Sequence, residues 1–150
     1  CNHIPHEGKI VDLFSGIGTY SFPMTKAHKV HAVESHDGMV SHLKKAAKKH
    51  ALEESLTAEC RDLFHAPLSK EELSKFEAVV INPPRPGAKR QVEEIAASAI
   101  RRVVMISCNP GTFARDAKIL KNAGFNLIHA EGIDQFVYSP HLEIAAVFGR

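Results

Sequence analysis

Cys108 lies in the segment ISCNPGTF, where a hydrophobic run gives way to the first turn of a predicted helix. Asn109 is a favoured helix N-cap and Pro110 is favoured at the first helical position, so the thiol precedes the positive end of a helix. That position stabilises the thiolate, which is the nucleophilic form of cysteine. We therefore expect Cys108 to be a nucleophile. Cys60 lies near a strand end without such a turn, and we expect it to be a buried structural cysteine.

A nucleophile needs a group that handles protons, and Glu143 is the candidate. It is an acidic residue in LEIAAVF, at the start of the last predicted strand, where packing alone would not select it. An exposed position on the polar face of that strand is the alternative.

The segment NPPRPG, residues 82–87, follows another predicted strand. Consecutive prolines fix an extended backbone and remove two hydrogen-bond donors, which is a costly way to build an ordinary surface loop. We expect a rigid wall from which Arg85 projects as a permanently charged donor for a carbonyl or a phosphate. An ordinary loop is the alternative.

The segment DLFSGIGTY indicates a cofactor site. Gly16 and Gly18 match the first two glycines of a dinucleotide fingerprint, but Ser21 occupies the third glycine position. Glu34 ends the next predicted strand, 18 residues after Gly16, where a carboxylate can accept both hydroxyls of a ribose. The alternative for Glu34 is a charge that favours the start of the next helix.

Two adenosine-bearing cofactors fit this pattern, a nicotinamide dinucleotide and S-adenosylmethionine. The diphosphate of the dinucleotide needs close approach to a helix N-terminus, whereas S-adenosylmethionine has no phosphate and accepts a looser glycine loop. Asp12 and Asp62 suit a cationic sulfonium with an amino-acid tail and an adenine amino group. For Asp62, which follows Arg61, a simple surface turn is the alternative. We expect S-adenosylmethionine.

Strands and helices alternate along the chain. The expected strands are Lys9–Phe14, Lys29–Glu34, Leu56–Cys60, Ala78–Ile81, Arg102–Ser107, Phe125–Ile133 and Leu142–Phe148. The expected helices are Tyr20–Ala27, a helix capped by Asp37 and running to about His50, Ser69–Lys75, Gln91–Ile100 and Pro110–Ala123. This order predicts a doubly wound α/β sheet, mostly parallel with one antiparallel strand. Ligands of such sheets bind at the carboxyl ends of the strands, where the unusual segments fall, and the loop DQFVYSPH is expected at a corner of that face.

Length and composition set the broad class. The chain has 150 residues and 44% apolar content, which fits one compact domain, and its net charge of +2 neither supports nor excludes an RNA substrate. Three cysteines without a CxxC pair argue against a disulfide framework or a zinc site and favour a reducing cytoplasm. The ten histidines lack the spacing of metal ligands, and no apolar run approaches the roughly 20 residues of a membrane span.

The segments DLFSGIGTYSFP, NPPRPG, ISCNPGTFARD and DQFVYSPHLE, in this order and spacing, resemble the RNA uracil-C5 methyltransferases that modify 23S ribosomal RNA and tRNA. The resemblance spans essentially the whole chain, and SCNP together with the final HxE is specific to that group. It implies a Rossmann-like class I methyltransferase domain in which Cys108 adds to C6 of a uracil and Glu143 removes the C5 proton. The positions that match the family's cofactor pocket are Phe14, Thr19, Glu34 and Asn82.

The resemblance also implies a methyl donor, S-adenosylmethionine, and an RNA substrate, with 23S ribosomal RNA favoured and the target uridine flipped out or single-stranded. We expect a monomer that acts without a metal ion. The family usually has aspartate where this chain has Asn82, which keeps an acceptor but loses the charge. Members also carry an N-terminal RNA-binding domain and a central insertion, so we interpret residues 1–150, which begin with Cys1, as a catalytic domain that alone binds RNA poorly.

Three other functions remain open on the sequence. NPP also resembles the motif of enzymes that methylate amino groups of adenine or cytosine, but those have an aromatic residue where this chain has Arg85, and they would leave Cys108 unused. A non-catalytic cofactor-binding module is the second, and a nicotinamide oxidoreductase is the third.

Overall fold

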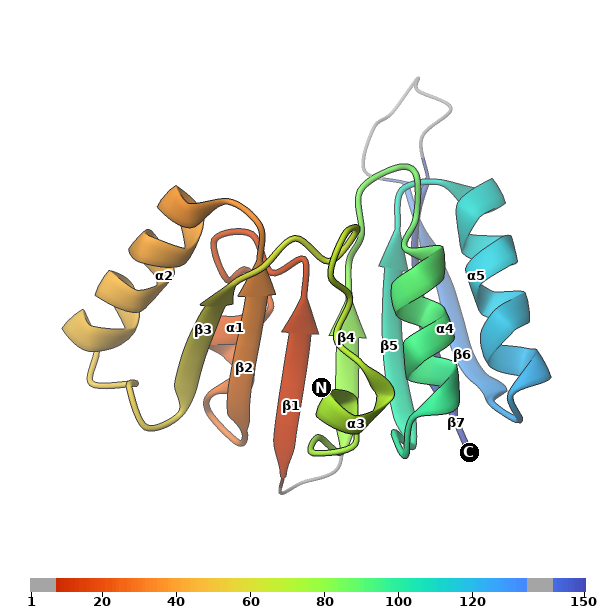
Figure 1. Ribbon diagram of the computed structural model, residues 1–150. Coiled ribbons are helices and arrows are strands. Elements are labelled where there is room, and N and C mark those ends of the chain that lie inside the picture. The colour runs from red at the N-terminus through yellow and green to blue at the C-terminus, as the bar shows by residue number, and fades with distance from the viewer. Residues whose placement is uncertain (1–7, 135–141) are drawn as a thin grey trace.

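The centre of the protein is a seven-stranded sheet, as seen in a computed structural model that describes residues 8–134 and 142–150 (Figure 1). The strands are β1 (Lys9–Leu13), β2 (Lys29–Glu34), β3 (Leu56–Cys60), β4 (Ala78–Ile81), β5 (Arg102–Ser107), β6 (Asn126–Ile133) and β7 (Glu143–Gly149). Their order in the sheet is β3-β2-β1-β4-β5-β7-β6. β7 pairs antiparallel with β5 and β6, and the other described pairs are parallel. The prediction of a mostly parallel, doubly wound sheet with one antiparallel strand is confirmed.

Helices cover both faces of the sheet. In the described residues they are α1 (Ser21–Met24), α2 (Asp37–Lys49), α3 (Lys70–Leu73), α4 (Lys89–Ala97) and α5 (Pro110–Asn122), and none of them is long and apolar enough to cross a membrane. Met24 of α1 and Leu43 of α2 pack with Ile10 on one face. Ile95 of α4 and Leu120 of α5 belong to the core of the other face, which is toward the viewer in Figure 1. The fold therefore has three layers.

β4 shows why the strand ends are held firmly. All four of its residues, AVVI, are buried, as expected for a parallel strand covered on both faces. Each fully buried side chain of the size of valine or isoleucine contributes about 1.5–3 kcal/mol through removal of apolar surface from water. The segments that follow such strands start from fixed positions, which suits them to carry a site.

The first helix is shorter than predicted. The sequence predicts a helix over Tyr20–Ala27, but α1 has four residues. Around and beyond Met24, backbone N–H groups close turns by donating to the carbonyl three residues earlier, as Thr25 N does to Phe22 O and Ala27 N does to Met24 O, each at 3.2 Å. These turns use the carbonyls in a tighter pattern than an α-helix does, so the helix ends there.

The predicted cap of α2 is wrong by one residue. His36, and not Asp37, is the N-cap, and its Nδ1 accepts a hydrogen bond from Met39 N at 3.4 Å. Asp37 is the first helical residue, where its charge is favourable with the helix dipole. An imidazole nitrogen here accepts the capping hydrogen bond that a side-chain oxygen of Ser, Thr, Asp or Asn usually accepts.

Candidate active site

The segments after β1, β2 and β4 meet at one edge of the sheet. Ser15 N donates to Val33 O at 3.1 Å, and Asn82 N donates to Leu13 O at 3.3 Å. These bonds continue the parallel pairing of the three strands past their carboxyl ends. The glycine loop, the end of β2 and the start of NPPRPG are therefore neighbours, as the sequence predicts.

Glu34 is tied to the glycine loop. Gly16, at φ +57°, donates its N–H to Glu34 Oε2 at 3.0 Å, and Oε1 accepts from Ser35 N at 2.8 Å and His36 N at 3.0 Å. Burial opposes the charge of Glu34, but these backbone hydrogen bonds outweigh it and lower its pKa. Each carboxylate oxygen has about two acceptor sites, so Oε2 keeps room for one more donor, such as a ribose hydroxyl.

Asp12 is fully buried at the end of β1. Ser21 Oγ donates to Asp12 Oδ2 at 2.5 Å, whereas Oδ1 has no hydrogen-bond partner among the described residues. Burial raises the pKa of Asp12 from 3.8 to about 6, and the bonds from Ser21 only partly oppose this. The buried Ser15 Oγ also lacks a described partner. Asp12 Oδ1 in β1 and Ser15 Oγ just after β1 are thus two acceptors without described donors. They fit a ligand that brings its own donors, such as a cationic amino group.

Replacing Asp12 with asparagine is expected to stabilise the protein at pH 7. Because the folded state holds the Asp12 proton more tightly than the unfolded chain does, the stability contributed by this group falls as the pH rises from 3.8 to about 6 and stays low above. Asp12→Asn should raise the free energy of unfolding by about 2–3 kcal/mol at pH 7 and by much less near pH 4.

Urea denaturation at both pH values measures this difference. Asp62→Asn is the matched control, because Asp62 is exposed and its pKa is lowered by the hydrogen bond from His65. A gain for Asp12→Asn that does not depend on pH would contradict a burial cost for the Asp12 charge.

The remaining predicted cofactor residues surround this loop. Phe14 has φ +60°, a conformation that is uncommon outside glycine and concentrates at functional sites. Its ring lies 5.4 Å from that of Phe64, which is 40% exposed. Thr19 is exposed, and Gly18 has φ +90°. The two rings form an apolar surface between the segments that follow β1 and β3.

Asp62 forms a local turn. Its Oδ1 accepts from Phe64 N at 2.9 Å, and its Oδ2 lies 2.7 Å from His65 Nδ1. This is the surface turn that the sequence leaves as the alternative. The turn also places Phe64 beside Phe14, so Asp62 lies at the edge of the site.

Cys108 lies between β5 and α5 and is half-buried. The side chain of Asn109 caps α5 by accepting from Gly111 N at 3.0 Å and Thr112 N at 3.4 Å, and Pro110 occupies the first turn. The predicted cap and start of this helix are confirmed. The sequence therefore places the Cys108 thiol at the amino end of a 13-residue helix.

Glu143 reaches the same edge from the opposite direction. Ser107, the last residue of β5, pairs with Ile144, so Cys108 follows one member of this pair and Glu143 precedes the other at the same end of the sheet. Glu143 is half-buried. Burial, the charge of Glu143 and the charge of Asp12 together raise the pKa of Tyr20. Tyr20 thus lies within the electrostatic reach of both acids, which brings the cofactor loop and the proposed base together.

NPPRPG lines this edge between β4 and α4. Asn82 is half-buried and Arg85 is exposed. The carbonyl of Arg85 accepts from Asn109 Nδ2 at 3.2 Å and from Thr112 Oγ1 at 3.2 Å. The wall that carries Arg85 is therefore joined directly to the turn that carries Cys108.

Several features differ from the sequence prediction or were missed by it. Cys60, expected to be buried, is exposed, because it ends the edge strand β3, and its Sγ donates to Ser35 O at 3.4 Å. Ser21 was noted only as a missing glycine, but it holds Asp12. Phe64 and Tyr20 were not assigned to the site. Most of the DQFVYSPH loop, including His141 of the HxE motif, lies outside the described residues.

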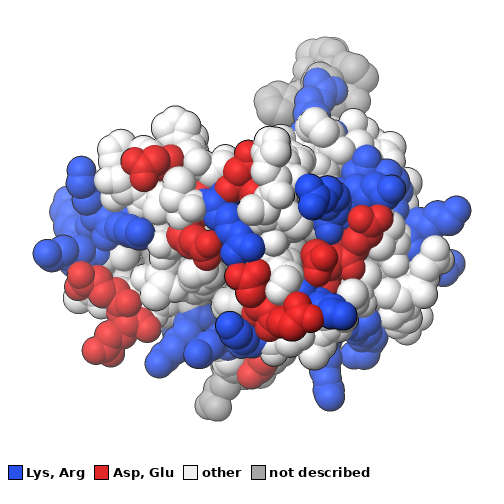
Figure 2. Space-filling view, viewed as in Figure 1, with Lys and Arg blue, Asp and Glu red and all other residues white. Residues whose placement is uncertain are grey.

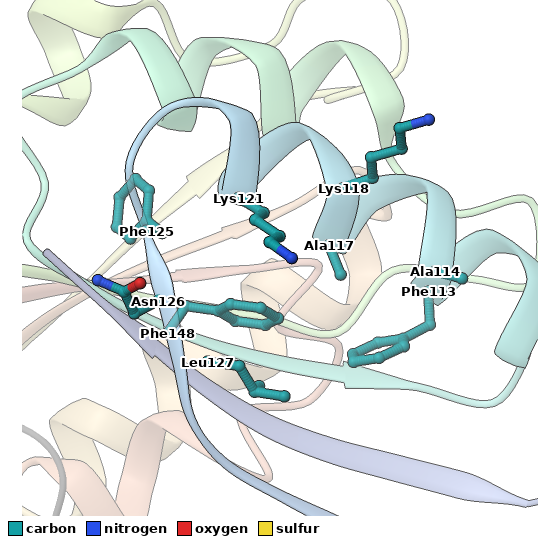
Figure 3. Close-up of a pocket in the computed structure, with 9 residues that line it drawn as sticks. All are labelled: Phe113, Ala114, Ala117, Lys118, Lys121, Phe125, Asn126, Leu127 and Phe148. Carbon is teal, nitrogen blue, oxygen red and sulfur yellow. The ribbon is translucent and has the colours of Figure 1, made fainter.

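A cavity beside α5 lies apart from the predicted site residues. This cavity of about 510 Å³ is lined by α5, Phe125, the start of β6 and Phe148, and none of the predicted site residues lines it. Figure 3 shows the residues that line this cavity. Its walls are mainly apolar, with Lys118 and Lys121 among them. No group of three metal-ligating side chains occurs among the described residues. Figure 2 shows acidic and basic side chains side by side over α3 and α4, in keeping with the small net charge.

Comparison with known proteins identifies the family. A model of the tRNA (uracil-5-)-methyltransferase family matches residues 4–150. An uncharacterized RNA methyltransferase of Caulobacter vibrioides is 44% identical over 95% of the chain, and the chain covers 34% of that relative. A 23S rRNA (uracil(1939)-C(5))-methyltransferase of Vibrio vulnificus is 37% identical over 95% of the chain, which covers 33% of it. The chain thus spans about a third of the length of these curated relatives.

A solved structure agrees with the fold. The tRNA (uracil-54, C5)-methyltransferase of Pyrococcus abyssi, in complex with S-adenosyl-L-homocysteine, superposes with a TM-score of 0.82 and 25% identity. The alignment covers 98% of the chain and 35% of that protein. The architecture is therefore that of a Rossmann-like methyltransferase domain.

Proposed function

Because the chain belongs to the tRNA (uracil-5-)-methyltransferase family, we propose that it transfers a methyl group from S-adenosylmethionine to C5 of a uridine in RNA. The observation that carries this proposal is the meeting of three features at one sheet edge, which are the Cys108 turn, Glu143 and the Glu34 loop. Ribosomal 23S RNA is the favoured target, since a 23S rRNA enzyme is 37% identical over 95% of the chain. We expect the enzyme to act as a cytoplasmic monomer without a metal ion.

The residues at this edge fit the methyl donor. Glu34 would accept a ribose hydroxyl, and Phe14 with Phe64 would contact the adenine ring. The buried Asp12 Oδ1 and Ser15 Oγ, which have no described partner, would accept from the amino group of the methionine tail. Gly16, Gly18 and Thr19 shape the loop around that tail, while Asn82 and Asp62 flank the pocket. When bound, the donor would supply an electrophilic methyl group, whose bond to the sulfonium sulfur breaks so that S-adenosylhomocysteine leaves.

Cys108 begins the reaction. C5 of uracil is too weak a nucleophile to accept a methyl group by itself, so the Cys108 thiolate first adds to C6. The thiolate electrons form the S–C6 bond, and the C5=C6 pair moves onto C5 and O4 as an enolate. Arg85 would hold a uracil carbonyl or an adjacent phosphate while this charge develops. The target base must leave its stack to reach the sulfur.

Glu143 completes the reaction as a base. After C5 has received the methyl group, it still carries its original hydrogen. Glu143 removes that proton, the electron pair of the C5–H bond re-forms C5=C6, and the S–C6 bond breaks to release the Cys108 thiolate. The antiparallel direction of β7 supports this role, because β7 begins at the end of the sheet where β5 finishes, one residue before Cys108.

A mechanism-based probe tests the proposal. The protein is incubated with S-adenosylmethionine and 23S rRNA transcribed with 5-fluorouridine, in which C5 carries fluorine and cannot release a proton. A covalent protein–RNA complex that survives denaturing electrophoresis and requires the methyl donor is expected. Methylation of adenine or cytosine amino groups would refute the proposal in favour of an amino-methylating enzyme, and donor binding without any adduct would refute it in favour of a non-catalytic cofactor-binding module.

A further inference from the structure

Helix α5 holds the NPPRPG segment at several points. Thr112 Oγ1 and Asn109 Nδ2 both donate to Arg85 O, each at 3.2 Å. One turn later Arg115 Nη2 donates to Pro86 O at 3.2 Å. NPPRPG has few donors of its own, because three of its residues are prolines. Its backbone position is therefore set by the first two turns of α5.

Asp116 anchors these contacts. Its side chain is 3% exposed, and its Oδ2 accepts from Ala88 N at 3.0 Å. Its Oδ1 accepts from Arg115 Nε at 2.8 Å and from Arg115 Nη2 at 2.7 Å. A buried carboxylate is costly unless its oxygens are satisfied, and here both are satisfied by the segment that it fixes. Asp116 thus aims Arg115 at Pro86 and holds the residue just after NPPRPG.

Gly87 gives independent support for a close fit. A Cβ on this residue would lie 2.5 Å from Arg115 Nη2 and 2.7 Å from Asp116 Oδ2, and its φ of +73° also favours glycine. The backbone of the NPPRPG segment therefore lies against the Arg115–Asp116 pair, and a side chain at residue 87 would have to displace that pair.

We infer that Asp116 is a positioning residue for the proposed reaction, which fixes Arg85 relative to Cys108. We call Asp116, Arg115 and the Ala88 amide the clamp. Asp116 acts through the other two, because Arg115 bonds Pro86 O and Ala88 directly follows NPPRPG. Asn82 is held separately, by its bond to Leu13 O at 3.3 Å. Loss of the clamp should therefore displace Arg85 while the cofactor side of the pocket stays in place. This inference rests on the proposed function.

The experiment compares Asp116→Ala with Asp116→Asn. In Asp116→Ala, the rate of adduct formation with 5-fluorouridine 23S rRNA should fall roughly 10- to 100-fold, because a misplacement of about 1 Å has effects of this size. The affinity for S-adenosylhomocysteine should stay within about threefold, because Asp116 bonds Ala88 and Arg115, and neither is a proposed cofactor residue. Asp116→Asn, which keeps an acceptor for Ala88 N, should recover part of the rate.

Hydrogen exchange of the Ala88 amide gives a readout that does not depend on activity. It should become about tenfold faster or more in Asp116→Ala, because its acceptor is lost. Ser98→Ala is the matched control: Ser98 is also buried and bonded to backbone, to Ile95 O at 2.8 Å, but it follows the carboxyl end of α4, at the opposite edge of the sheet. It should change neither the Ala88 exchange rate nor the adduct rate.

The outcomes separate the inference from the proposed function. If the unaltered protein forms no adduct even when the RNA is saturating, the proposed function fails, and Ala88 exchange alone decides whether the clamp exists. If Asp116→Ala does not fold, Thr112→Val, which removes the hydroxyl that bonds Arg85 O and Asn109 O, should still slow the adduct step without changing cofactor affinity. An adduct rate in the Asp116 and Thr112 variants equal to that of Ser98→Ala would overturn the inference.

Discussion

Protein with Cys108 replaced by alanine is expected to form no adduct with 5-fluorouridine RNA and to lose methyl transfer by at least roughly 10³-fold, as other enzymes do when stripped of their nucleophile. The physical reason is that C5 of uracil becomes nucleophilic only after the sulfur has added to C6. The affinity for S-adenosylhomocysteine should not change, because the proposed cofactor contacts come from β1 and from the segments after β1, β2, β3 and β4, and not from the Cys108 turn after β5.

The control is Cys60→Ala. Cys60 is the more exposed of the two described cysteines, with its sulfur bonded to Ser35 O, and it lies at the end of the edge strand β3. Denaturing electrophoresis and transfer of a radioactive methyl group should show full function in this variant. Residual methylation of uracil by Cys108→Ala, or dependence on Cys60, would remove the basis of the mechanism.

Glu143→Gln is expected to separate the two halves of the reaction. Cys108 can still add to C6 and C5 can still accept the methyl group, but the C5 proton is no longer removed. With ordinary uridine RNA, turnover should fall by about 10²- to 10⁴-fold, the usual contribution of a general base. A covalent complex carrying a methylated base should accumulate, which mass spectrometry of the digested complex can measure.

Glu131→Gln is a suitable control for this variant. Glu131 is paired with Ala145 across β6 and β7, so it is an acidic residue on the same pair of strands, but its side chain is 67% exposed. It should turn over normally. A Glu143→Gln variant that loses turnover without any trapped complex would show that Glu143 is needed before methyl transfer, and not for proton removal.

The strands were predictable because each is a short apolar run with a clear boundary. β2, β3, β4 and β5 have the predicted bounds. For β4 the reason is clearest, since a parallel strand buried on both faces leaves a continuous run of β-branched and apolar residues. The order of strands in the sheet was not predictable in detail. The insertion of β7 between β5 and β6 depends on long-range pairing, which local patterns do not record.

The site was partly predictable for a similar reason. Cys108 and Arg85 stand out because asparagine and proline accompany them just after a predicted strand, and Glu34 stands out because it ends a strand 18 residues after Gly16. Ser21 and Asp116 do not stand out, because each is a polar residue of a helix whose partner is distant in sequence: Asp12 for Ser21, and Ala88 for Asp116. A buried acid within an amphipathic helix is indistinguishable from an exposed one until the packing is known.

The position of β7 has a consequence for synthesis of the protein. β6 is made before β7, yet its only described partner in the sheet is β7, and all eight β6 residues, Leu127 and Ile128 among them, are exposed on the finished fold. While a ribosome is still translating residues 135–149, β6 has no strand to join, and Cys108 has no acid opposite it. The nascent polypeptide therefore carries β6 as an unpaired strand, which can bind chaperones or associate wrongly with other chains. This state lasts until β7 inserts between β5 and β6.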